Sequence, residues 1–189
     1  MLEKGDWRVP KEPEIWISYW CAFHDGRLVK IESDQLERTV DLTIQLGFPK
    51  PPYPHPFVVR LRFEGVKFAL VHAQRQWPGP KPPARWTQEE VIAYHAKILI
   101  ETVSLAEIAQ HLSSKPEDYI YDAEFAEESE TAWLRFEVQG TDDFAYWMVQ
   151  IVGSSVRVWP DDESSITMEE LLEIGGRAWE AWHKKNQVP

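Results

Sequence analysis

His24 and Asp25 are the neighbouring side chains in this sequence whose types best suit chemistry. An imidazole exchanges a proton near neutral pH, and a carboxylate can orient the ring. Adjacent residues on an extended chain point to opposite faces, however, so the two side chains do not automatically converge. The competing interpretation is a turn in which Asp25 bonds the backbone and Gly26 supplies an unusual dihedral angle. We expect the turn, with no catalytic residue here.

A similar local pattern stands in the second half of the chain. Tyr121-Asp122-Ala-Glu-Phe repeats the order of ring, aspartate, small residue, charge and apolar residue found from His24 onward. If Asp122 also shapes a turn, two similar turns argue against catalysis, because an active site seldom needs duplicate copies. The likeness allows a duplicated meander-plus-helix unit, but the spacing between matches is not constant, as a true repeat requires.

Motifs for metals and cofactors are missing from the sequence. No two histidines stand four residues apart, and Cys21 is the single cysteine, so zinc-site spacings are absent. The sequence also lacks the glycine-rich phosphate-binding motifs and the nucleophile elbow. We therefore predict no metal and no cofactor. Cys21 has apolar neighbours and is expected to be a small buried residue without nucleophilic function.

The tryptophans are the most unusual feature of the composition, since there are ten of them. Most are expected in the core, but Trp77 and Trp86 flank a proline-rich stretch, residues 78–83. Large amphipathic rings anchor interfaces and stack on flat ligands. Trp77 and Trp86, together with His24 and Asp25, are therefore the predicted binding residues.

Period-two alternation of apolar and polar residues predicts the strands. The stretches 39–46 and 57–63 each place apolar residues on one face, and a second series of strands is expected from 118 to 159. The stretch 144–152 has no polar face, so we expect it at the centre of its sheet. Shorter strands are expected at 27–32 and at 15–20. Consecutive strands of this kind indicate antiparallel meanders.

Helix-start signals stand at three places. Thr87, Ser104 and Thr167 are each followed by a glutamate three residues later and flanked by apolar residues, which is the capping box with a hydrophobic staple. Gly175 and Gly176 interrupt the last helix, and a close approach of that helix to the sheet would justify them.

These elements predict an α+β fold: antiparallel meanders of about eight strands, with about three helices packed on the sheet. The 189 residues suit a single domain spanning 1–189, and they allow two subdomains, 1–115 and 116–189.

The formal net charge of −11 disfavours nucleic acid and anionic membranes as partners. No apolar run approaches the roughly 20 residues that cross a bilayer, and the N-terminus lacks a signal-peptide core. We expect a cytoplasmic protein. A basic protein partner would suit the charge, because opposite fields speed encounter.

The run F-H-D-G-R-L-V-K-I-E, followed by E-R-T-V-D-L-T-I and V-R-L-R-F-E-G-V, resembles a strand pattern in uncharacterised bacterial immunity-protein-like families. The resemblance covers residues 19–72 and implies a β-rich cytoplasmic protein that blocks a toxin by binding it. Of the candidate residues, it covers His24, Asp25 and Gly26.

Three functions remain open from the sequence. The first is a non-enzymatic acidic module that binds a basic protein. The second is a small-molecule or carbohydrate binder, or an enzyme, with a Trp-lined pocket near His24 and Asp25. The third is a structural subunit of a homo-oligomer.

Overall fold

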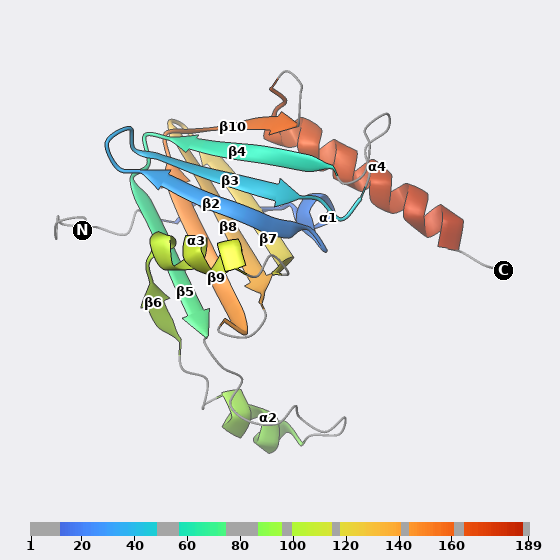
Figure 1. Ribbon diagram of the computed structural model, residues 1–189. Helices are drawn as coiled ribbons and strands as arrows, with labels where there is room; N and C mark the ends of the chain where they lie inside the picture. Colours follow the sequence, from blue (N-terminus) through green and yellow to red (C-terminus); the bar gives the residue numbers. More distant parts are fainter. Residues whose placement is uncertain are drawn as a thin grey trace.

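The computed structural model describes residues 12–48, 57–74, 87–95, 100–114, 118–140, 144–160 and 165–186. In these segments the chain forms one antiparallel sheet of ten strands together with four helices (Figure 1), which confirms the predicted α+β class. The strands are β1 (Ile17–Ser18), β2 (Arg27–Asp34), β3 (Thr39–Gln45), β4 (Val58–Glu64), β5 (Phe68–Gln74), β6 (Glu101–Val103), β7 (Tyr119–Glu128), β8 (Thr131–Gln139), β9 (Tyr146–Gly153) and β10 (Ser155–Pro160). The helices are α1 (Trp20–Phe23), α2 (Gln88–His95), α3 (Leu105–Ser114) and α4 (Met168–Asn186).

The alternating stretches form strands as predicted. In β3, Val40, Leu42 and Ile44 are buried, while the residues between them are half-buried. β9 lies between β8 and β5 in the sheet, as its lack of a polar face predicts. Side-chain alternation therefore identified both the strands and their inward faces.

Two meanders with the same plan build the sheet. The strand order is β10-β4-β3-β2-β7-β8-β9-β5-β6, and the tenth strand, β1, pairs with β7 outside this path. In the first, β2, β3 and β4 pair in turn, and the chain then continues into β5, which pairs with β9. In the second, β7, β8 and β9 pair in turn, and the chain continues into β10, which pairs with β4. Strands from both sides of residue 115 thus interleave in one sheet.

The two continuing strands bend at glycines that face each other. Gly65 has φ +56°, and a Cβ on it would lie 2.5 Å from Ser154 Oγ. A Cβ on Gly153 would lie 2.8 Å from the carbonyl oxygen of Glu64. Side chains are excluded at both bends because the two chain paths touch there, and Gly65 also needs the left-handed backbone that favours glycine.

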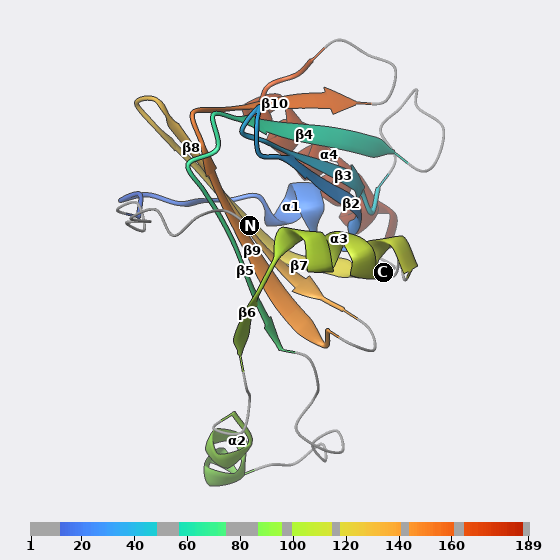
Figure 2. The same ribbon diagram turned by 60° about the vertical axis from the view of Figure 1, so that its left-hand side comes forward.

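The core lies between the two meanders. It takes Leu42 and Phe63 from the first and Phe136 and Trp147 from the second, all buried in one cluster. The views show the two parts of the sheet turned toward each other with α1 and α3 between them (Figures 1 and 2). On the open side, one residue pair, Arg27 with Tyr119, joins β2 to β7.

The predicted capping residues begin the three longer helices. Thr87 Oγ1 accepts the N–H of Glu90 at 3.3 Å, and the Glu90 carboxylate accepts the N–H of Thr87 at 2.8 Å, which lowers the pKa of Glu90. Thr167 and Glu170 make the same reciprocal pair at 3.0 and 2.7 Å. Ser104 Oγ accepts a backbone N–H three residues later at 3.2 Å. Among the described segments, no helix has the length and apolar character that crossing a membrane requires.

The segment 15–20 differs from its prediction. Its strand ends at Ser18, and the chain turns into α1, which packs against α4. A Cβ on Gly175 would lie 2.5 Å from the carbonyl oxygen of Cys21 in α1, whereas one on Gly176 would meet nothing within 4 Å. The close approach that Gly175 permits is therefore to another helix, and not to the sheet as we expected.

Candidate functional site

His24 and Asp25 form the turn between α1 and β2, where the sequence predicts one. Asp25 has φ +60°, in the left-handed region that aspartate tolerates better than most residues. The unusual dihedral thus belongs to Asp25 and not to Gly26, which corrects our expectation. Glycine is needed at position 26 because a Cβ there would lie 2.7 Å from the carbonyl oxygen of Phe23.

A hydrogen bond fixes the His24 ring. Its Nδ1 lies 2.8 Å from the carbonyl oxygen of Tyr121. A carbonyl oxygen only accepts, so Nδ1 carries the proton and donates. The pairing of β7 with β8 skips Tyr121, which makes this residue the extra one of a β-bulge. The bulge and the turn therefore meet at the imidazole.

The His24 and Asp25 side chains approach each other because the chain turns between them. His24 Nε2 lies 3.6 Å from Asp25 Oδ1, and the Asp25 side chain is 69% exposed. Among the described residues, no three histidine, cysteine, aspartate or glutamate side chains are grouped so that they could hold a metal ion. Asp25 is open to solvent, whereas the His24 side chain is 20% exposed, and the pair is not part of a larger ionisable cluster of that kind.

Aromatic rings from three elements surround His24. Trp20 of α1 stacks on the imidazole with ring centroids 4.3 Å apart, and the Trp179 ring of α4 lies 4.8 Å from that of Trp20. Trp182 contacts Trp179 at 5.7 Å, and Tyr121 meets His24 edge-on at 6.0 Å. We call these five residues the aromatic cluster. Trp20, Tyr121 and Trp182 are 38%, 57% and 54% exposed, so the cluster presents rings to solvent.

The other predicted residues lie elsewhere. Asp122 is inside β7, directly opposite Glu137 of β8, and does not shape a turn as expected. The reason is that β7 continues through its bulge as one strand, so the chain does not turn at Asp122. The segment at Tyr121 therefore resembles the segment at His24 in residue types but not in backbone conformation. Trp77 and Trp86 lie outside the described residues.

A recess of about 460 Å³ opens beside the His24 turn, where β2 meets β7. Its lining combines Asp25 with Arg27, whose guanidinium lies 5.6 Å from the centre of the Tyr119 ring. The remaining lining residues are Gln45, Leu46, Gly47 and Phe48. One acid, one base and two aromatic rings thus converge on this recess.

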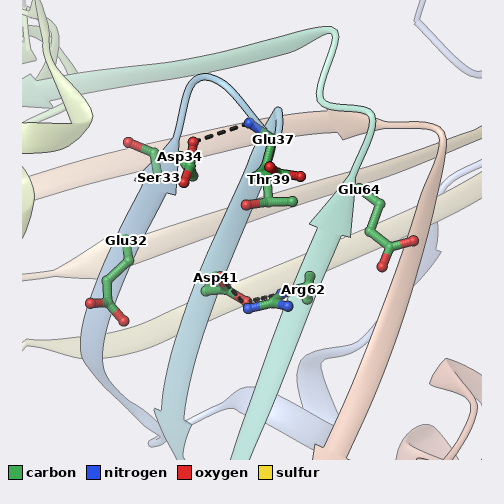
Figure 3. A pocket seen from close by; sticks show the side chains of 8 residues that line it. All are labelled: Glu32, Ser33, Asp34, Glu37, Thr39, Asp41, Arg62 and Glu64. Atoms are coloured by element: carbon green, nitrogen blue, oxygen red, sulfur yellow. Dashed lines mark hydrogen bonds and ion pairs between the residues drawn. The ribbon is translucent and has the colours of Figure 1, made fainter.

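A larger recess, of about 700 Å³, lies on the outer side of β2, β3 and β4 and on the β2–β3 hairpin (Figure 3). We call this surface the acidic face. Carboxylates dominate its lining, with five of them against one guanidinium. The lining residues are Glu32, Ser33, Asp34, Glu37, Thr39, Asp41, Arg62 and Glu64.

Alternation explains why four of these carboxylates share one side, because they occupy outward positions of strands whose other face is core, whereas Glu37 lies in the β2–β3 turn. Arg62 donates to both carboxylate oxygens of Asp41 at 2.7 and 3.0 Å, and these hydrogen bonds raise the pKa of Arg62. The cation in the lining of this recess is therefore already paired with a carboxylate. At the margins, Lys30 lies 2.7 Å from Glu32 and Arg157 lies 3.1 Å from Glu64. Set against these three cations, the five carboxylates leave an excess of two negative charges on the face and its margins.

A buried polar group, which the sequence did not reveal, joins three elements. His111 Nε2 of α3 lies 2.7 Å from Asp118 Oδ2, and Trp147 Nε1 of β9 donates to the same oxygen at 2.9 Å. The His111 and Asp118 side chains are almost fully buried. His111 precedes Asp118 by seven residues and Trp147 follows it by 29, and neither spacing is that of a recognised motif. Its position suits a structural tie between the end of α3, the start of β7 and β9.

In comparisons with protein-family models, curated proteins and solved structures, none matched the chain.

Proposed function

We propose that this chain is a non-enzymatic binding module whose acidic face captures a basic protein. The observation that carries the proposal is the grouping of five carboxylates around one arginine on the outer side of β2, β3 and β4. A surface of one sign steers an oppositely charged partner toward it and disfavours partners of like charge. The net charge of −11 acts in the same direction over longer distances.

The shape of the acidic face agrees with a protein ligand better than with a small molecule. Its strands are paired on both sides of β3 and β4, so the surface is preformed. Preformed surfaces bind with little ordering cost. Small-molecule sites are concave and largely apolar, whereas this recess is lined by charged and polar side chains.

The resemblance of residues 19–72 to immunity-protein-like families favours one form of the proposal, in which binding occludes a toxic basic partner. The acidic face belongs to this same stretch, since β2, β3 and β4 all lie within it. Inhibition by occlusion needs contact and charge, and needs no turnover.

Binding of an oligolysine peptide tests the acidic face. The triple variant Glu32→Gln, Glu37→Gln and Glu64→Gln removes three negative charges with little change of shape. We expect about tenfold weaker binding in calorimetric titration at low ionic strength, since three exposed ion pairs together contribute roughly 1.4 kcal/mol. At roughly 1 M salt, where the Debye length is about 3 Å, binding by both proteins should be lost.

A matched control variant distinguishes the effect of the acidic face on peptide binding from the effect of the total charge. Glu130→Gln, Glu173→Gln and Glu180→Gln remove the same charge from exposed positions away from the face. We expect this control to bind nearly as wild type does. Equal weakening by both triple variants would contradict the proposal, because binding would then follow total charge alone.

A second candidate function is a small-molecule site at the recess beside His24 and Asp25. It is favoured by the convergence of Asp25, Arg27, Phe48 and Tyr119 on one hollow. Thermal-shift screening of wild type against His24→Ala and Asp25→Ala checks it. A ligand that stabilises wild type but neither folded variant supports this function, and variants that change only thermal stability argue against it.

A further inference from the structure

The C-terminal end of α4 is an exposed basic surface. This end extends past the strands (Figure 1), and residues 180–185 are exposed. The last turn carries His183, Lys184 and Lys185. Among the described residues, no carboxylate pairs with either lysine. Since Lys185 follows Trp182 by three positions, it lies on the same side of the helix, beside the aromatic cluster.

The aromatic cluster therefore has a cationic margin. Its rings are stacked on one another, and Trp20, Tyr121 and Trp182 are all more than one-third exposed. Exposed tryptophan and tyrosine next to a cation favour contact with an apolar side chain that has acidic neighbours.

The tip of the β2–β3 hairpin has that composition. Leu36 is 94% exposed, and Asp34 and Glu37 flank it. Asp34 Oδ1 accepts the backbone N–H of Leu36 at 2.8 Å and of Glu37 at 3.1 Å. Arg38, at φ +52°, donates to the carbonyl oxygen of Val66 at 3.0 Å. These bonds hold an apolar side chain out in solvent on an ordered turn.

The two surfaces cannot meet within one molecule. Figure 1 places the hairpin tip and the C-terminal end of α4 at opposite ends of the fold. Their charges are complementary, and each offers apolar surface to the other. We propose that the hairpin tip of a second copy of this chain docks on the aromatic cluster, between Trp182 and the Tyr121 side of the His24 turn, with its acidic residues toward Lys185.

The inference rests on the proposed function in one respect, because the tip is the end of the acidic face. A contact between two different surfaces is heterologous, so repeated docking produces rings or open chains and not a two-fold dimer. Self-association would also cover part of the acidic face and so compete with a basic partner.

Sedimentation velocity across a concentration series tests the inference. At low ionic strength, wild type should sediment faster as its concentration rises, and roughly 1 M salt should return it to monomer. Lys185→Glu should remain monomeric at all concentrations. Arg177→Glu reverses one charge eight residues earlier in the same helix, roughly 12 Å from Lys185 along its axis, and should associate as wild type does.

Charge exchange between the two surfaces gives the decisive measurement. Glu37→Lys alone should also remain monomeric. Its mixture with Lys185→Glu should associate, because the intact tip of Lys185→Glu can dock on the intact helix end of Glu37→Lys and the reversed tip can dock on the reversed helix end. A wild type that stays monomeric, or an equimolar mixture that stays monomeric when wild type associates, overturns the inference. So does an Arg177→Glu variant that loses association to the same extent as Lys185→Glu.

The oligolysine titration keeps the two proposals apart. Lys185→Glu leaves the acidic face intact, so it should bind the peptide at least as well as wild type does. Peptide binding without self-association rejects the inference and leaves the proposed function standing. Self-association without peptide binding rejects the proposed function and limits the acidic tip to contacts between copies.

Discussion

The Nδ1 atom of His24 and the carbonyl oxygen of Tyr121 are 2.8 Å apart, and this contact ties the turn before β2 to the bulge in β7. The histidine thus links the two meanders at the end where a single residue pair joins β2 to β7. Its partners are a carbonyl, an exposed carboxylate and stacked rings, which together suit a structural and binding role.

The first prediction concerns this link. His24→Ala removes the hydrogen bond and the stacking on Trp20, so we expect a loss of about 1–3 kcal/mol in the free energy of unfolding. Asp25→Asn keeps a residue that tolerates positive φ and should change stability by less than about 0.5 kcal/mol. Urea unfolding of both variants measures this, and equal losses would show that His24 does not link the meanders.

The second prediction uses the adjacent glycines of α4. Gly175→Ala should destabilise the protein by roughly 1–3 kcal/mol, because its Cβ would meet the α1 backbone at 2.5–2.8 Å. Gly176→Ala has open space and should stabilise by about 0.5–1 kcal/mol through helix propensity. Opposite shifts in melting temperature are expected, and a tolerated Gly175→Ala would mean that α1 and α4 are not in close contact.

The third prediction concerns the buried group of His111, Asp118 and Trp147. Asp118→Ala leaves the imidazole and the indole N–H without their shared acceptor, so we expect a loss of about 3 kcal/mol or more. Trp147→Phe removes one donor and should cost less than Asp118→Ala. If chemical denaturation ranks the two variants in the opposite order, the carboxylate is not the centre of this group.

The fourth prediction concerns alkaline pH. Burial, followed by the charges of Glu169 and Glu127, raises the pKa of Tyr19 to about 12 from an ordinary 10.0. The folded state therefore favours the neutral phenol, and this stabilisation is fully present below pH 10 and is lost as pH rises toward about 12. Tyr19→Phe should lose less stability over this window than wild type does.

The control for that titration is Tyr121→Phe, which removes an exposed phenol. Its unfolding free energy should fall with pH as steeply as that of wild type. If Tyr19→Phe follows the same curve as this control, Tyr19 is not the group that limits stability in alkali.

The fifth prediction concerns Cys21. Burial raises the pKa of its thiol, and its Sγ lies 3.8 Å from the carbonyl oxygen of Leu172. Because the thiolate is the reactive form, a disulfide reagent at neutral pH should modify the folded protein much more slowly than the urea-unfolded chain. Equal rates in the two states would show that α1 does not protect the thiol.

Local sequence patterns were sufficient for most strands and for the starts of α2, α3 and α4, but they did not predict α1 or β6. Val40, Leu42 and Ile44 share a face because of two-residue periodicity, and Thr87 and Thr167 cap their helices through side-chain chemistry that acts over three residues. The pairing of β5 and β10 each with a strand of the other meander was not predicted. Alternation shows which face of a strand is buried but not which strand it pairs with.

The candidate surfaces also differ in whether local sequence patterns could predict them. The turn at His24 follows from adjacent residues. Most of the acidic face lies at the outward positions of strands that alternation predicts, and Glu37 lies in the turn between two of them. The aromatic cluster joins Trp20 to Trp179 across most of the chain, and no local pattern contains that contact. Gly175 was the available signal, because a glycine inside a helix often marks a close approach.

At Gly65 the chain of the first meander bends into β5, which pairs with β9 of the second meander. At Gly153 the chain of the second meander bends into β10, which pairs with β4 of the first. Neither half of the polypeptide can complete its hydrogen-bond ladder alone. A nick near residue 115 should therefore yield two fragments that are unstructured when separated and that regain the native fold when recombined.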